Sequence, residues 1–131
     1  MTMHAAIEFI EGKIVVPPLE LPSREIGASL DFLGIVRELE GGVPRPGLHY
    51  HAHESMARKH LLKHIHELEK IYSCESVHFV HRLGWVPVEE ASLFVRVLSA
   101  HRGDALGFLG DLIDRLKRDV PIWKGVAGPK S

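Results

Sequence analysis

The sequence has little of several things that would point at once to a class of function. Its single cysteine, Cys74, cannot form an internal disulfide, which suits a reducing compartment. The chain has sixteen Lys and Arg residues and seventeen Asp and Glu residues. Its net charge of −1 therefore attracts neither nucleic acid nor an acidic membrane. No apolar run approaches the roughly 20 residues of a membrane span. Any anion that binds must therefore be held by a local cluster of cations.

Common catalytic signatures are also missing. The chain has no glycine-rich phosphate loop, no serine nucleophile elbow and no paired CxxC motif. Its first residues, MTMHAAIEFIEGK, lack the basic segment and apolar segment of a secretory signal, so we expect a cytoplasmic protein. A chain of 131 residues with 45% hydrophobic and 25% charged content fits one domain, residues 1–131, with a real core.

Apolar periodicity predicts strands in the first half of the chain. We expect residues 5–18 to form a short strand pair that ends at Pro17 and Pro18. Residues 27–39 alternate apolar and polar side chains and should form a strand running toward Arg37, with residues 48–53 as its partner. Residues 76–88 and 91–102 should be two further strands, flanking a turn near Gly84–Pro87.

Two segments have the 3.6-residue period of a helix. From Glu54 onward, one helical face collects Met56, Leu61, Ile65, Leu68 and Tyr72. Residues 103–119 form the second helix, which stops before Pro121. The resulting order predicts an α+β domain with a mainly antiparallel sheet and two main helices.

The second helix leads into DRLKRDVPIWKG, where Lys117 and Lys124 each follow a bulky apolar residue. On a helical projection, Lys117 shares a row with Ile113, Gly110 and Leu106, an apolar or small-residue side. One interpretation is a lysine that extends to solvent from the helix C-terminus, where the helix dipole favours a cation. The other is a lysine at the rim of a pocket, where its amine can act as acid, base or nucleophile. Spacing alone does not decide between them.

The same helix carries an array of charges with a simpler interpretation. Asp111 precedes Arg115 by four residues, and Asp114 precedes Arg118 by four, which is the favoured order for ion pairs along a helix. These residues are expected to form a solvated face.

Other cations stand at strand ends. Arg37 closes a predicted strand, and His101–Arg102 stand where a strand meets the second helix, where backbone N–H groups and an arginine can bind an anion. His81–Arg82 repeat the dipeptide before Gly84. Together with the two lysines, these residues suggest a basic pocket for phosphate or carboxylate, although each alone could be an ordinary surface residue.

Ten histidines invite a metal hypothesis that we set aside. His49, His51 and His53 alternate, as side chains on one face of a strand would. His60 and His64 are four residues apart on a helix, but HLLKH lacks the glutamate of HExxH. Without a carboxylate or thiolate at a clear spacing, we expect surface histidines and no metal, and we expect Cys74 to be a buried or unreactive thiol.

Several motifs in order then resemble a known family. GASLDFLGIVR, HRLGWVPVEEASLFVRVLSAHR and LIDRLKRDVPIWK resemble the large, catalytic subunit of molybdopterin synthase, over residues 27–124. The most specific parts are Phe32, Gly34 and Arg37 in FxGxVR, the HRxG turn, the SAHR junction and the closing LKxxxPIWK.

The resemblance implies a hammerhead-type α+β fold and a homodimer. It also implies a small ubiquitin-like partner whose C-terminal Gly-Gly thiocarboxylate supplies sulfur, so that two of each subunit form a heterotetramer. The implied reaction moves that sulfur onto cyclic pyranopterin monophosphate to make molybdopterin, without a cofactor. Lys117 would then be the principal catalytic lysine and Lys124 a helper, while Arg37, His101 and Arg102 would bind the pterin phosphate.

The chain also departs from the family pattern. Val126 follows where relatives carry an acid in WKxE, the tail beyond it is short, the strand YEAY is YHAH at Tyr50–His53, and the segment before Gly27 is short. The alternative reading is therefore a non-catalytic relative that dimerises and docks the small subunit's tail.

Overall fold

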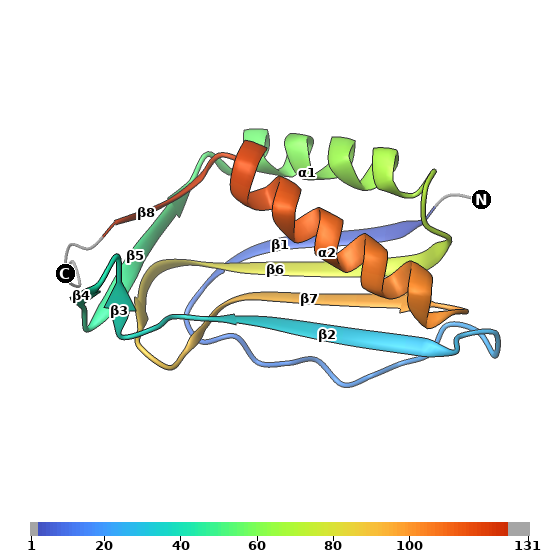
Figure 1. Ribbon diagram of the computed structural model, residues 1–131, viewed down its shortest axis with the longest axis horizontal. Helices are drawn as coiled ribbons and strands as arrows, with labels where there is room; N and C mark the ends of the chain where they lie inside the picture. Colours follow the sequence, from blue (N-terminus) through green and yellow to red (C-terminus); the bar gives the residue numbers. More distant parts are fainter. Residues whose placement is uncertain (1–2, 126–131) are drawn as a thin grey trace.

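A six-stranded sheet forms the base of the computed structural model, which describes residues 3–125 (Figure 1). Its strands are β1 (His4–Glu11), β2 (Ala28–Ile35), β5 (Gly47–Ala52), β6 (Cys74–Pro87), β7 (Ala91–Ser99) and β8 (Ile122–Gly125). They lie in the order β2-β7-β6-β5-β8, and β1 pairs with β6. Every pairing is antiparallel except that of β1 with β6. A separate small hairpin joins β3 (Leu39–Glu40) to β4 (Val43–Pro44).

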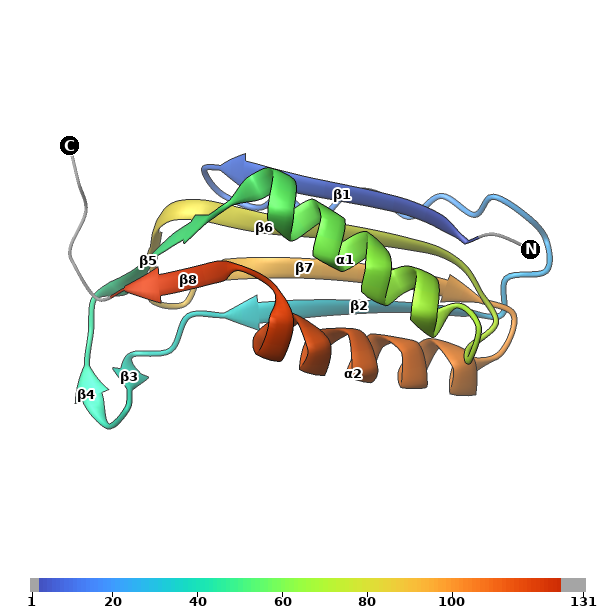
Figure 2. The ribbon, with the colours of Figure 1, turned by 90° about the horizontal axis from the view of Figure 1, so that it is seen from above.

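Two helices, α1 (Glu54–Leu68) and α2 (Arg102–Asp119), cover one face of this sheet (Figure 2). The predicted α+β class with two main helices is confirmed. Among residues 3–125, no helix is long and apolar enough to cross a membrane.

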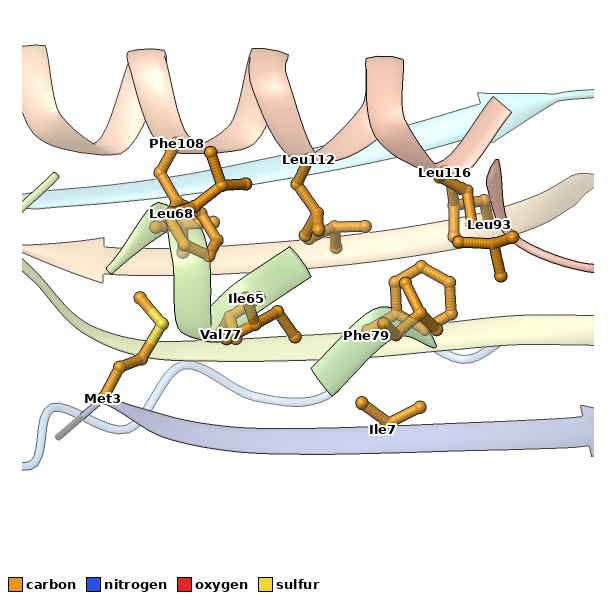
Figure 3. Close-up of a cluster of buried hydrophobic side chains, with 14 of the residues drawn as sticks. Met3, Ile7, Ile65, Leu68, Val77, Phe79, Leu93, Phe108, Leu112 and Leu116 are labelled. Atoms are coloured by element: carbon orange, nitrogen blue, oxygen red, sulfur yellow. The ribbon is translucent and has the colours of Figure 1, made fainter. Parts of the chain in front are cut away.

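The core fills the space between the helices and the sheet (Figure 3). Phe79 on β6 and Phe108 on α2 are completely buried there. Removing side chains of this size from water stabilises the fold by roughly 1.5–3 kcal/mol each. The rest of the buried set comes from both helices, from β1, β6 and β7, and from the residues just before β1 and just after α2: Met3, Ile7, Ala57, Leu61, Ile65, Leu68, Val77, Leu93, Val95, Val97, Ala105, Leu112, Leu116 and Val120.

The buried side of α2 differs from the expected one. Its buried residues are Ala105, Phe108, Leu112 and Leu116. The row of side chains that contains Lys117 is therefore offset by one residue from this buried row. Leu106 on that row is 57% exposed. Lys117 therefore sits at the border between the buried side of α2 and solvent, and not within an apolar stripe.

Strand pairing differs from the expectation in three places. Residues 5–18 do not form the expected strand pair. They contribute only to β1, and beyond Glu11 this segment, which carries Pro17 and Pro18, pairs with no other strand. The partner of β2 is β7, whereas the expected partner, β5, pairs with β6 and β8. The expected turn at Gly84–Pro87 is part of β6, and the chain reverses between Pro87 and Ala91.

A polar cluster joins the two helices outside the core. Arg115 on α2 donates from Nη1 to Glu67 Oε1 on α1 at 2.5 Å, and its Nη1 lies 3.2 Å from His64 Nδ1. His64 is only 8% exposed, and its Nε2 is 3.5 Å from Asp119 Oδ2. Burial and the nearby Arg115 guanidinium lower the pKa of His64. This side chain is therefore neutral at pH 7, with Nδ1 accepting and Nε2 donating.

The expected ion pairs along α2 are wrong. Asp111 accepts a hydrogen bond from Tyr72 Oη at 2.6 Å, and Arg115 reaches across to α1. Arg118 contacts its neighbour Asp119 at 3.5 Å. Asp111 and Arg115 thus have partners outside α2, whereas Arg118 contacts a neighbour on the same helix.

Buried neutral His64 predicts a loss of stability in mild acid. The unfolded chain, with a histidine pKa near 6.5, takes up a proton that folded His64 resists. The free energy of unfolding should therefore be highest above about pH 6.5 and fall as the pH is lowered toward 5. Urea unfolding at a series of pH values should show a shallower fall for His64→Gln. The exposed control His4→Gln should keep the wild-type slope, and equal slopes for all three proteins would contradict the assignment.

Candidate active site

A cavity of about 410 Å³ opens where the C-terminal end of α2 meets the ends of the sheet strands. Three cations predicted from the sequence, Arg37, Lys117 and Lys124, line it together. None of the described residues in its wall is acidic, so the cavity suits an anion. The other wall residues are Phe32, Gly34, Ile35, Val36, Leu48, Tyr50, His81, Ser92, Leu93, Ile113, Leu116 and Ile122.

The two lysines reach the cavity because the chain reverses after α2. The helix ends at Asp119, Val120 takes an extended conformation, and Pro121 cannot continue the helix. The chain then pairs as β8 with β5, which brings Lys124 opposite Tyr50. Lys117 lies on the last turn of the helix, where the helix dipole favours a positive charge. Both lysine side chains are exposed at the cavity's mouth, which differs from the partial burial that their apolar neighbours suggested.

Arg37 is positioned by the residue before it. Val36 is almost fully buried against Leu48 and Val86, and its backbone N–H and C=O bond Glu90 O and Glu89 N at 3.0 and 2.9 Å. This clamp holds the chain just beyond β2 and leaves the Arg37 side chain exposed at the cavity. Phe32 and Gly34 of the same FxGxVR motif also line the wall.

The His81–Arg82 dipeptide divides between the two faces of β6. His81 is 5% exposed and lies in the cavity wall, with its Nδ1 2.8 Å from the carbonyl oxygen of Arg82. Its ring meets the Tyr50 ring edge-on, with 5.2 Å between centroids. Burial lowers the pKa of His81, against the smaller effect of the Arg82 carbonyl. Arg82 instead donates to Glu90 Oε1 at 2.7 Å, so only His81 belongs to the site.

His101 and Arg102 lie at the other end of α2. His101 is the N-cap residue of the helix and Arg102 is its first residue, and both are exposed. Lys117 comes fifteen positions after Arg102 on the helix, which is about 22 Å along the axis. Within one chain these two residues therefore do not join the cavity that holds Arg37 and the lysines.

The histidine-rich strand is shorter than the alternation suggested. β5 ends at Ala52, and His53 caps α1 by accepting the Met56 N–H at 3.3 Å through Nδ1. His53 therefore leaves the strand that holds His49 and His51. Residues 3–125 contain no group of three or more side chains arranged to hold a metal ion.

Cys74 lies away from the cavity wall, at the start of β6. Its Sγ donates to the Asp104 carbonyl oxygen at 3.5 Å, and the thiol is half-buried. Burial raises the pKa of Cys74 to about 12. The thiol is thus protonated at neutral pH and a poor nucleophile.

One wall residue, Tyr50, was not predicted from the sequence to belong to the site. It belongs to the YHAH strand, and its contribution depends on pairing between β5 and β8, which no local pattern signals. Val126, which stands where the family pattern has an acid, lies outside the described residues.

Comparisons with known proteins agree on one family. The family model described as MoaE protein matches residues 11–119. The molybdopterin synthase catalytic subunit of Thermoplasma volcanium is 36% identical over 113 residues, which are 83% of this chain and 82% of that protein. The rice protein of the same name, from Oryza sativa subsp. indica, is 39% identical over 98 residues, 75% of this chain and 51% of that protein. This chain thus spans about half the length of the rice protein.

Solved structures show the same fold. A molybdopterin synthase structure from Staphylococcus aureus has a TM-score of 0.75 and 30% identity, covering 91% of this chain and 92% of that one. A complex of subunits 1 and 2 of the molybdopterin-converting factor from Helicobacter pylori contains a chain with a TM-score of 0.69 and 24% identity, covering 90% of this chain and 82% of that one. The family match and the Thermoplasma relative each cover most of the sequence, and so this chain belongs to the MoaE protein family.

Proposed function

We propose that this chain is the catalytic subunit of a molybdopterin synthase in the cytoplasm. It transfers sulfur from the C-terminal thiocarboxylate of a small ubiquitin-like protein onto cyclic pyranopterin monophosphate. The observation that carries the proposal is the meeting of Arg37, Lys117 and Lys124 at one cavity without an acidic wall residue among those described. Relatives named catalytic subunit, which align over most of the chain, support it.

The cations have two tasks in such a reaction. The substrate's phosphate needs a counter-charge, and Arg37 can bind it through two parallel N–H donors. Attack on an acyl carbon places negative charge on the carbonyl oxygen, and an ammonium group beside that oxygen stabilises it. Lys117 is our candidate for this oxyanion contact. Lys124, opposite Tyr50 on the neighbouring strand, would position the substrate and the donor's tail.

The sulfur donor must bring its C-terminus into the cavity. A flexible Gly-Gly tail is narrow and can adopt the conformations that a confined approach requires. The solved complex of two subunits from Helicobacter pylori supports a protein partner for members of this fold.

His101 and Arg102 can join the site only from a second copy. Strand β2 is an edge of the main sheet, and Leu33 and Ile35 on it are exposed. Two copies paired through antiparallel β2 edges would bring the start of one β2 beside the end of the other. The start of β2 lies beside Ser99, just before His101, and its end lines the cavity. We therefore propose a homodimer with shared sites, which two small subunits complete as a heterotetramer.

Reconstitution tests the reaction and the role of Lys117. The protein is mixed with a thiocarboxylated small subunit and cyclic pyranopterin monophosphate, and molybdopterin is measured as its oxidised fluorescent derivative. Lys117→Ala should lower the rate at least about 100-fold because the oxyanion loses its cation. Binding of the small subunit, measured by calorimetry, should change little.

The matched control for Lys117→Ala is Arg118→Ala, the exposed cation next along the same helix. It should keep the wild-type rate. A Lys117→Ala protein with near-normal turnover would remove Lys117 from the mechanism. A wild-type protein that binds the small subunit without forming product would instead be the non-catalytic relative, which the names of the curated relatives do not favour.

Mixing two inactive variants tests the shared site. Lys117→Ala and Arg102→Ala are each expected to be inactive as homodimers. After subunit exchange, half of the dimers are mixed, and each mixed dimer has one intact site, so about one quarter of the wild-type rate should return. If Arg102 acts within its own chain, or not at all, the mixture will show no gain over its two components.

The sulfur route should not involve Cys74. Because its pKa is raised to about 12, the folded protein should react with iodoacetamide at pH 7.5 far more slowly than the urea-unfolded protein. Cys74→Ser should form molybdopterin at the wild-type rate. Rapid labelling of the folded protein, or a dead serine variant, would show that the thiol takes part.

A further inference from the structure

The cations of the cavity leave one chemical requirement unmet. Lysine and arginine side chains are donors at neutral pH and do not accept protons. Yet once the donor's sulfur has bonded to the pterin, it is still joined to the acyl carbon of the tail as a thioester. Releasing it by water requires a group that takes a proton from that water.

His81 has the geometry for this task. It lies in the cavity wall, and only 5% of it is exposed. Its Nδ1 is bound to the Arg82 carbonyl at 2.8 Å, and because a carbonyl only accepts, the proton must be on Nδ1. Nε2 is then the nitrogen with the free electron pair. The edge-on contact with Tyr50 and the backbone bond hold the ring in one orientation.

His81 is also in the correct protonation state. Its pKa is lowered by burial, so the imidazole is neutral at pH 7 and able to accept a proton. Three positive groups line the same cavity as His81: Arg37 from beyond β2, Lys117 from α2 and Lys124 from β8.

We propose that His81 is a catalytic residue, an inference that rests on the proposed function. It is the general base for hydrolysis of the acyl–sulfur bond between the small subunit's tail and the pterin. Water oxygen bonds to the acyl carbon, and one water proton passes to His81 Nε2. The carbon–sulfur bond breaks, and its electron pair leaves with sulfur as a thiolate on the pterin. The tail leaves as a carboxylic acid, which ionises, and His81 returns its proton to solvent.

The test is a single turnover followed by intact-mass measurement of the small subunit. His81→Asn keeps an N–H near the Nδ1 position for the Arg82 carbonyl but removes the basic nitrogen. In this variant the small subunit should accumulate as an adduct heavier by the pterin, and release of its carboxylate form should slow at least about 100-fold. The matched control is His78→Asn, on the same strand but on the opposite face, where His78 is hydrogen-bonded to Glu8.

A second variant separates chemistry from folding. His81→Ala opens space in the wall, and added imidazole should restore release of the carboxylate in proportion to its concentration, which a purely structural histidine would not permit. A wild-type release rate in His81→Asn would overturn this inference and leave the proposed function intact. The same conclusion would follow if the His81 variants were slow but accumulated no adduct and were not rescued by imidazole. A wild-type protein that forms neither adduct nor molybdopterin would overturn the proposed function, and the inference with it.

Discussion

The apolar contact between α2 and the sheet is the constraint on which the site depends. Phe108, Leu112 and Leu116 fix both the rotation and the end point of the helix. Lys117 is one position beyond that buried row, so its amine emerges at the cavity's edge. The reversal at Pro121 begins from the same anchored end and delivers Lys124 to the neighbouring strand. The position of Lys117 thus depends on the packing of α2, and that of Lys124 on the pairing of β8 with β5, rather than on a local motif.

The long central strand β6 supplies the second constraint. It pairs with β7 along one edge, and with β1 and then β5 along the other. Successive side chains on a strand point to opposite faces, so His81 enters the cavity while Arg82 binds Glu90. The strand β6 thus places a buried imidazole in the cavity wall and a partly buried ion pair on the other face of the sheet.

Local patterns predicted local structure well and long-range structure poorly. The span of α2 is predicted closely because its 3.6-residue period and Pro121 are visible in the sequence. The alternation over residues 27–39 predicts the start of β2, but the strand ends earlier, at Ile35. The predicted partner of β2 is wrong because strand pairing depends on which strands meet in space, and alternation in the sequence carries no such information. The four-residue spacing predicts an ion pair between Arg115 and Asp111, but Arg115 pairs with Glu67 on α1. Arg37, Lys117 and Lys124 were predicted through motifs and meet in the structure, whereas Tyr50 required knowledge of the β5–β8 pairing.

The parallel pairing of β1 with β6 has a consequence for synthesis of the chain. His4 pairs with Ser76, so β1 leaves the ribosome about seventy residues before its partner strand exists. At 5–20 residues per second, that interval is about 4–14 s, during which Ile7 and its apolar neighbours have no sheet to join. Newly made chains would therefore be exposed to aggregation at this strand, and they should depend on a chaperone more than a sheet built from adjacent hairpins would.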